Sequence, residues 1–64
     1  MLNNNIARFR AEHGLSQQQL ADEINVSRKT ISTVETGRFT PSVIIALRLA
    51  ERFAAPVEEV FYLS

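Results

Sequence analysis

The side chains best able to make strong polar contacts gather between residues 27 and 40. This stretch carries three cations, Arg28, Lys29 and Arg38, against a single acid, Glu35, with serine and threonine hydroxyls among them. Guanidinium, ammonium and hydroxyl groups donate hydrogen bonds to phosphate oxygens and to the acceptor atoms of guanine. The chemistry that this stretch favours is therefore contact with a nucleic acid.

The charge of the whole chain argues in the other direction. The formal net charge is zero, with seven basic and seven acidic residues, whereas a nucleic-acid binder is usually basic. The acids gather mostly outside the cationic stretch, at Asp22, Glu23, Glu58 and Glu59. Because phosphate binding depends on local charge, the neutral total weakens a nucleic-acid role without excluding it.

The sequence offers little for other chemistry. It has no cysteine, and its single histidine, His13, has neither a second histidine nor a carboxylate cluster beside it, so no metal site or cofactor is expected. No glycine-rich phosphate loop and no nucleophile–base pair can be found, so we expect neither an enzyme nor a small-molecule site. No apolar run approaches the roughly 20 residues of a membrane span, and no signal peptide is visible, so a cytoplasmic protein is expected.

Glycine, proline and capping residues divide the chain into five expected helices. Ser16 and Ser27 are good N-caps, and Asn25 suits a left-handed turn between the second and third helices. The expected helices cover residues 3–13, 17–24, 28–36, a fourth opened by Pro41 and Ser42, and 57–61. The prediction is one all-α domain over residues 1–64, with chain ends that could pair as short strands.

The second and third helices are separated by the short interval of a helix-turn-helix. Five apolar positions would lock the two helices together: Leu20, Ile24, Val26, Ile31 and Val34. With Ile31 and Val34 inward, steps of about 100° per residue turn Lys29, Ser32, Thr33 and Thr36 outward, with Arg28 on the flank. That face would read DNA bases, or, in the alternative interpretation, would be a merely solvated surface.

The stretch GLSQQQLADEINVSRKTISTVETGRFTPS resembles the Cro/phage-repressor-type helix-turn-helix (Xre) regulators. The likeness lies in SQ and LA around the second helix, VS, TIS and the E–G pair around the third, and PS before the fourth. The resemblance implies a compact five-helix DNA-binding domain that acts as a homodimer on a palindromic operator, most often as a transcriptional repressor. It also resembles the shortest members, which lack a ligand-sensing domain. Asn25 departs from the family's usual glycine.

The resemblance also implies roles for individual residues. Base edges would be read by Arg28, Lys29, Ser32 and Thr33, and phosphates would be held by Gln17, Thr36, Arg38 and Thr40. Arg10 and Glu35 lie at the edge of the apolar faces of their helices, where an unpaired charge is costly. The likeness suggests that these two residues form a structural ion pair.

The fourth helix suggests a dimer surface. We expect Val43, Ala46, Leu47, Ala50 and Phe53 to face the core, which leaves Ile44, Ile45 and Leu49 without an intramolecular partner. The predicted homodimer interface is Leu2, Ile45, Leu49, Phe61, Tyr62 and Leu63; alternatively, these side chains close over the domain's own base. Phe39 is expected to plug its loop onto the core rather than to stack on nucleic acid.

A protein-interaction module, such as an antitoxin of the same fold that neutralises a toxin, is the alternative function. Antitoxins of this fold usually also bind DNA, so the two functions can coexist. An antitoxin would be expected to carry extra length that wraps its partner, and this chain has almost none.

Overall fold

Three of the five helices have a serine as the N-cap, the residue just before the first helical position. The computed structural model describes residues 1–64, and its helices α2 (Gln17–Ile24), α3 (Arg28–Glu35) and α4 (Val43–Phe53) follow Ser16, Ser27 and Ser42. Each serine side chain accepts a hydrogen bond from the backbone N–H three residues on, which supplies a partner that the first turn of a helix lacks. At α2 the side chain of Gln19 also accepts from the N–H of Ser16 at 2.8 Å, completing a capping box.

The turn between α2 and α3 depends on one left-handed residue. Asn25 has φ 62° and ψ 48°, as its sequence position predicts, and Val26 then donates its N–H to the carbonyl of Ala21 at 2.9 Å. Asparagine tolerates this conformation better than most residues do. The chain therefore changes direction within three residues, 25–27, and α3 packs against α2.

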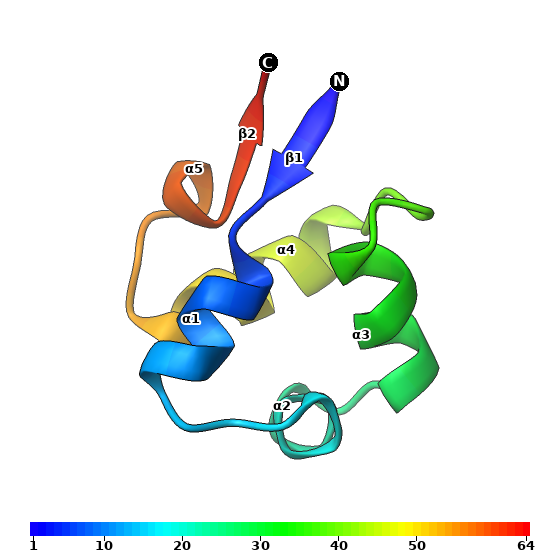
Figure 1. Cartoon of the computed structure of the whole chain (residues 1–64), viewed down its shortest axis with the longest axis vertical. Coiled ribbons are helices and arrows are strands. Elements are labelled where there is room, and N and C mark those ends of the chain that lie inside the picture. The colour runs from blue at the N-terminus through cyan, green and yellow to red at the C-terminus, as the bar shows by residue number, and fades with distance from the viewer.

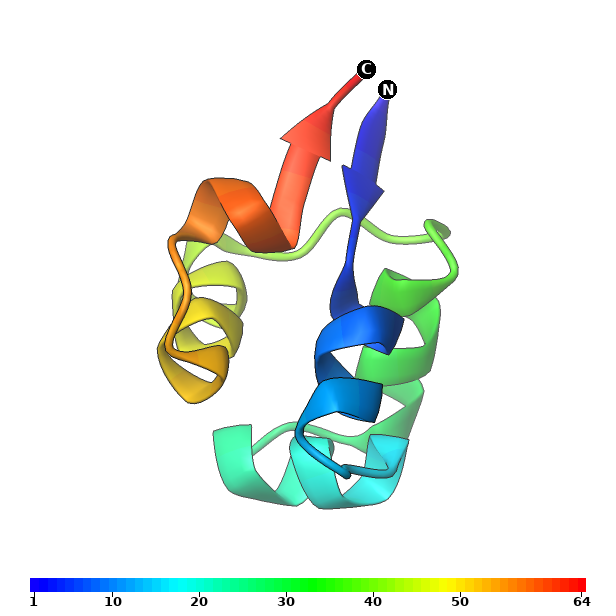
Figure 2. The same cartoon turned by 60° about the vertical axis from the view of Figure 1, so that its left-hand side comes forward.

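The two ends of the chain form a strand pair. β1 (Leu2–Asn4) is antiparallel to β2 (Phe61–Leu63), with Leu2 opposite Leu63. In Figures 1 and 2 this pair projects from one end of the helical body, with both termini side by side. The expected terminal strands are thus confirmed. The flanking helices α1 (Ile6–Glu12) and α5 (Val57–Val60) are shorter than expected, because residues 3–4 and 61 belong to the strands.

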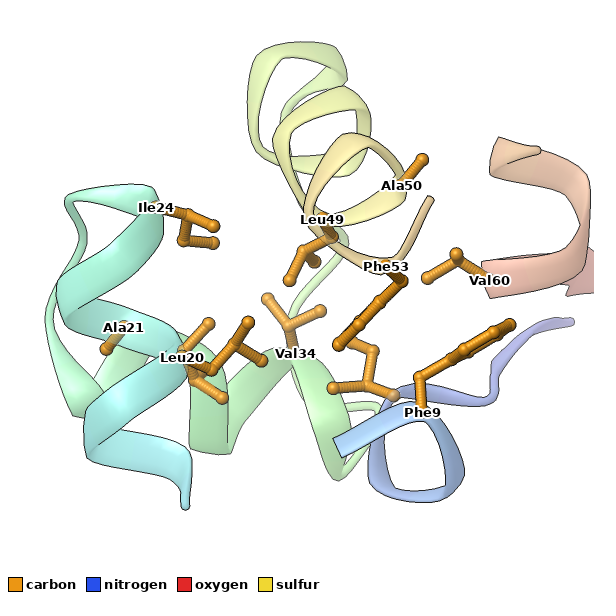
Figure 3. Close-up of a cluster of buried hydrophobic side chains, with 11 residues drawn as sticks. Phe9, Leu20, Ala21, Ile24, Val34, Leu49, Ala50, Phe53 and Val60 are labelled. Carbon is orange, nitrogen blue, oxygen red and sulfur yellow. The ribbon is translucent and has the colours of Figure 1, made fainter. Parts of the chain in front are cut away.

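The core is entirely apolar and draws on all five helices. Its buried residues are Ile6, Phe9, Leu20, Ala21, Ile24, Ile31, Val34, Leu49, Ala50, Phe53 and Val60. Figure 3 shows α2, α3 and α4 directing side chains toward one another, with Phe9 and Phe53 at one side. The rings of Phe9 and Phe53 stack at 5.1 Å between centroids. Burial of this cluster fixes how α2 and α3 are rotated about their axes.

The expected core face of α4 is confirmed at Ala50 and Phe53 but wrong at Val43 and Leu47, a difference of about one residue of rotation. Val43 and Leu47, expected in the core, are 74% and 53% exposed, whereas Leu49 is fully buried. Ile45 is half-buried and packs against the core. Leu49 therefore cannot lie on a dimer interface, and Ile45 contributes mainly to the core of its own chain.

Burial of Leu49, Ala50 and Phe53 stabilises this rotation, and two arginines of α4 make contacts compatible with it. Arg48 donates to the carbonyl of Ile24 at 3.3 Å, and the Nε of Arg52 donates to Glu23 at 2.9 Å. Both contacts hold one flank of α4 against the C-terminal end of α2. Leu49, which follows Arg48 by about 100° around the helix, then faces inward.

None of the helices has the length and apolar character needed to cross a membrane.

Candidate nucleic-acid interface

The outer face of α3 is set by two buried residues. Ile31 and Val34 are 0% and 2% exposed, so the opposite side of the helix faces solvent. Along that side run Lys29, Ser32, Thr33 and Thr36, of which Lys29 and Thr36 are exposed and the other two half-buried. Arg28 is exposed on the flank. The structure thus brings the predicted base-reading residues together on one accessible face.

The threonine hydroxyls of this face already have partners within the helix. The hydroxyl of Thr33 lies 2.9 Å from the carbonyl of Lys29 and 3.1 Å from that of Thr30, and the hydroxyl of Thr36 lies 2.8 Å from that of Ser32. Since a hydroxyl has one hydrogen, each threonine retains only oxygen lone pairs and a methyl group for a ligand. Thr33 is therefore suited to accepting a hydrogen bond or approaching a thymine methyl, not to donating to guanine.

The predicted phosphate-binding residues flank α3 in the chain. Gln17 is half-buried at the first position of α2, where backbone N–H groups without intrahelical partners favour an anion. Arg38 and Thr40 are exposed in the connection between α3 and α4. The N–H of Arg38 donates to the carbonyl of Thr33 at 3.0 Å, which holds this connection at the end of α3.

The only acid of the cationic stretch, Glu35, is paired with an arginine of α1. Glu35 accepts two hydrogen bonds from Arg10, at 3.0 Å from Nε and 2.8 Å from Nη2, and the two side chains are only 12% and 20% exposed. The hydrogen bond that Arg10 donates to Glu35 raises the pKa of Arg10 above its ordinary value, although burial opposes the shift. The third contact of Arg10, 3.0 Å to the carbonyl of Leu15, ties the α1–α2 connection to the pair. The outer face of α3 is left with Arg28 and Lys29 and no free carboxylate, although the chain as a whole is neutral.

The arrangement of α2, the left-handed turn and α3 matches a known family. A helix-turn-helix family model, HTH_3, matches residues 6–60. The chain belongs to this helix-turn-helix family. As a member, it is an HTH-type DNA-binding transcriptional regulator rather than an enzyme, and the predicted family and fold are confirmed.

Relatives of this regulator share nearly its full length. It is 34% identical over 63 residues to the HTH-type transcriptional regulator YgzD of Bacillus subtilis (strain 168), covering 98% of this chain and 96% of the relative. Among solved structures, it is similar to the restriction-modification controller protein C.AhdI of Aeromonas hydrophila, with a TM-score of 0.78, 30% identity and 84% and 82% of the two chains covered. A Bacteroides fragilis protein has a TM-score of 0.84 at 24% identity over 95% and 98% of the chains, a likeness that concerns the fold alone.

Phe39 does not plug its loop onto the core of this regulator, and that prediction is wrong. Its side chain is 53% exposed. The hollow beneath the loop has a volume of only about 20 Å³, and Leu2, Pro41 and Phe61 line it together with Phe39. Phe39 thus lies at the rim of this hollow, beside Arg38 and Thr40 in the chain, with about half of its side chain in solvent.

Sequence reasoning missed Asn4. The side-chain amide of Asn4 donates to the carbonyls of Val34 and Glu35, each at 3.2 Å. It thereby contacts the C-terminal end of α3 from β1, across 30 residues of sequence. No local pattern distinguishes Asn4 from its neighbours Asn3 and Asn5, so the sequence carries no signal for this contact.

Proposed function

We propose that this regulator reads a specific DNA sequence with the outer face of α3 and binds a palindromic operator as a homodimer that represses transcription. The observation that carries the proposal is the acid-free face of α3, whose one neighbouring carboxylate, Glu35, is paired with Arg10 at 2.8 Å. Arg28, Lys29, Ser32 and Thr33 contact base edges. Gln17, Arg38 and Thr40 hold phosphates, and Thr36 does so once its hydroxyl turns from the carbonyl of Ser32, because a phosphate oxygen only accepts hydrogen bonds.

Lys29→Ala is expected to weaken binding to the preferred sequence by about 1–3 kcal/mol, because it removes a donor to a base edge. The preferred duplex is first recovered by selection from a random DNA pool, and a scrambled duplex of the same composition serves as reference. Lys29 is exposed, so the fold is expected to stay intact by circular dichroism. Equal losses on the selected and scrambled duplexes would show that Lys29 contacts only phosphates.

Arg38→Ala is the matched control for a cation that holds the backbone. It is expected to weaken both duplexes by a similar factor and to lower the slope of log affinity against log salt concentration by about one. Titrations of both variants at several salt concentrations separate the two roles.

The dimer is supported by apolar side chains gathered on the strand pair. Leu2, Tyr62 and Leu63 are 36%, 43% and 80% exposed, and Met1, absent from the predicted interface, is 90% exposed. Leu2 and Leu63 oppose each other on one face of the strand pair and Tyr62 lies on the other face, so apolar groups are exposed on both sides of this end of the domain, which favours a partner there. A two-fold dimer through these residues would cover them and would present two copies of α3, which on a palindrome lie about 34 Å apart. Phe61 lies half-buried behind this surface and supports it.

Leu63→Asp and Tyr62→Asp are expected to convert the dimer to a monomer and to cut affinity for a palindromic duplex severalfold, because a charge would be buried at the interface. Sedimentation equilibrium over a concentration series measures the first effect, and titration of the selected duplex measures the second. Ile44→Asp is the matched control, since Ile44 is an apolar residue of α4 that is 63% exposed and lies outside the proposed surface. A wild-type monomer at high micromolar concentration would contradict the dimer. A dimer broken by Ile44→Asp alone would show that the interface lies on α4 rather than on the strand pair.

Binding of a second protein is the other candidate function, and the exposed face of α4 favours it. Val43, Ile44 and Leu47 are 74%, 63% and 53% exposed along one side of the helix. A toxin or another regulator could cover this face while α3 remains free for DNA. A partner that co-purifies with the regulator and stays bound at high salt would support this role.

A further inference from the structure

Asn4 stands where three elements meet. It is the last residue of β1, its Oδ1 accepts the N–H of Ile6 at 3.1 Å at the start of α1, and its Nδ2 lies 3.2 Å from each of two carbonyls of α3. The side chain is half-buried, and both of its polar atoms have partners. Figure 2 shows β1 descending beside the C-terminal end of α3.

The contact matters because the last carbonyls of a helix have no partner within it. Near the end of α3, the carbonyl of Thr33 accepts from the N–H of Arg38 at 3.0 Å, and that of Val34 accepts from Gly37 at 3.1 Å. The carbonyl of Glu35 accepts instead from Asn4. Asn4 thus completes the hydrogen bonding of the helix end from a distant element.

Glu35 is consequently held at two points. Arg10 of α1 binds its carboxylate, and Asn4 of β1 binds its carbonyl. Two contacts on one residue restrain both the position and the rotation of the end of α3. Thr36 and Arg38, which follow directly, are proposed to contact DNA phosphates.

We propose that Asn4 is a positioning residue for base reading, which joins the terminal strand pair to the recognition helix α3 and sets the angle between them. The inference rests on the proposed function, since it concerns how α3 meets the bases. Hydrogen bonds to base edges require close distances and angles, whereas phosphate contacts through long flexible cations tolerate a small rotation. Loss of the Asn4 contact should therefore reduce discrimination between sequences more than it reduces affinity for DNA in general.

Two substitutions remove the contact to α3 while keeping the one to α1. Asn4→Asp and Asn4→Ser both retain an oxygen that can accept the N–H of Ile6 two residues on, as aspartate and serine side chains do in turns. Neither can donate to the carbonyls of Val34 and Glu35, because aspartate has no hydrogen to give and the serine hydroxyl is too short to span both. Asn3→Asp is the matched control: it adds the same charge one residue away, where the side-chain amide contacts only the hydroxyl of Ser64.

The measurement is the ratio of affinities for the selected and scrambled duplexes, with helix content and thermal unfolding followed in parallel. We expect this ratio to fall about tenfold in Asn4→Asp and Asn4→Ser, because a displaced α3 misaligns about one hydrogen bond to a base edge. Asn3→Asp is expected to leave the ratio unchanged. An unchanged ratio in folded Asn4 variants, or an equal loss on both duplexes, would overturn the inference.

A measurement on the unaltered chain covers the case in which the Asn4 variants do not fold. The side-chain amide resonances of Asn4 are expected to shift when the selected duplex is added and to stay in place with the scrambled one, while those of Asn3 do not move. Absence of a sequence-dependent shift at Asn4 would overturn the inference. A wild-type chain that prefers no duplex would instead contradict the proposed function itself.

Discussion

Leu49→Ala is expected to destabilise the folded domain by about 2–5 kcal/mol, the range for truncating a buried leucine. Leu49 is fully buried, and Figure 3 shows its side chain directed into the cluster that includes Val34 and Phe53. A core of this size rarely supplies more than about 3–5 kcal/mol of net stability. The variant is therefore expected to be largely unfolded at 25 °C, as followed by circular dichroism in urea.

Leu47→Ala is the matched control, since it makes the same change two residues away. Leu47 is 53% exposed, so its truncation is expected to alter the free energy of unfolding by no more than about 0.5 kcal/mol. The opposite ranking, with Leu47 costly and Leu49 neutral, would mean that α4 is rotated as its apolar periodicity alone suggested. It would also return Leu49 to a dimer interface.

Removal of either member of the Arg10–Glu35 pair is expected to cost about 2–4 kcal/mol of stability, because the remaining charge stays in a poorly hydrated position. The two side chains are 20% and 12% exposed and share two hydrogen bonds. The double variant Arg10→Ala/Glu35→Ala is expected to cost less than the sum of the single variants, with a coupling energy of about 1–3 kcal/mol. Urea unfolding of the wild type and the three variants completes this cycle. A coupling energy near zero would contradict the contact.

The pH dependence of this pair follows from the raised pKa of Arg10. A group whose pKa is raised on folding contributes its full stability below its unfolded-state pKa and loses it only as the pH rises through the folded-state value. For Arg10 that window lies at strongly alkaline pH, so titration of Arg10 is expected to add no slope to stability between pH 6 and 9.

Removing Arg10 would also leave the carboxylate of Glu35 without its partner near the DNA-binding face. Arg10→Ala should therefore lower affinity for every duplex, and Arg10→Ala/Glu35→Ala should recover part of it.

The sequence by itself determined the elements whose signals are local. The bounds of α2 agree with those predicted, because the capping box at Ser16 and the left-handed Asn25 both act within one turn of the helix. The outer face of α3 was also predictable, since Ile31 and Val34 are the only large apolar residues in that helix and allow one rotation. Helical angles showed only that Arg10 and Glu35 lie at the edge of the core. The family resemblance added the prediction that the two side chains form an ion pair.

Only the tertiary structure decided the rotation of α4, the register of the strand pair and the contact made by Asn4. The start of α4 is apolar at nearly every position, so one stripe through Val43 and Leu47 and another through Ile45 and Leu49 fit the helical period equally well. Packing of Leu49 against the other helices selects the second stripe, and the contacts of Arg48 and Arg52 with the end of α2 are compatible with it. Helix caps join residues a few positions apart and can be recognised in the sequence. Strand pairing and the Asn4 contact join residues that lie far apart along the chain, and packing of the whole domain selects their partners.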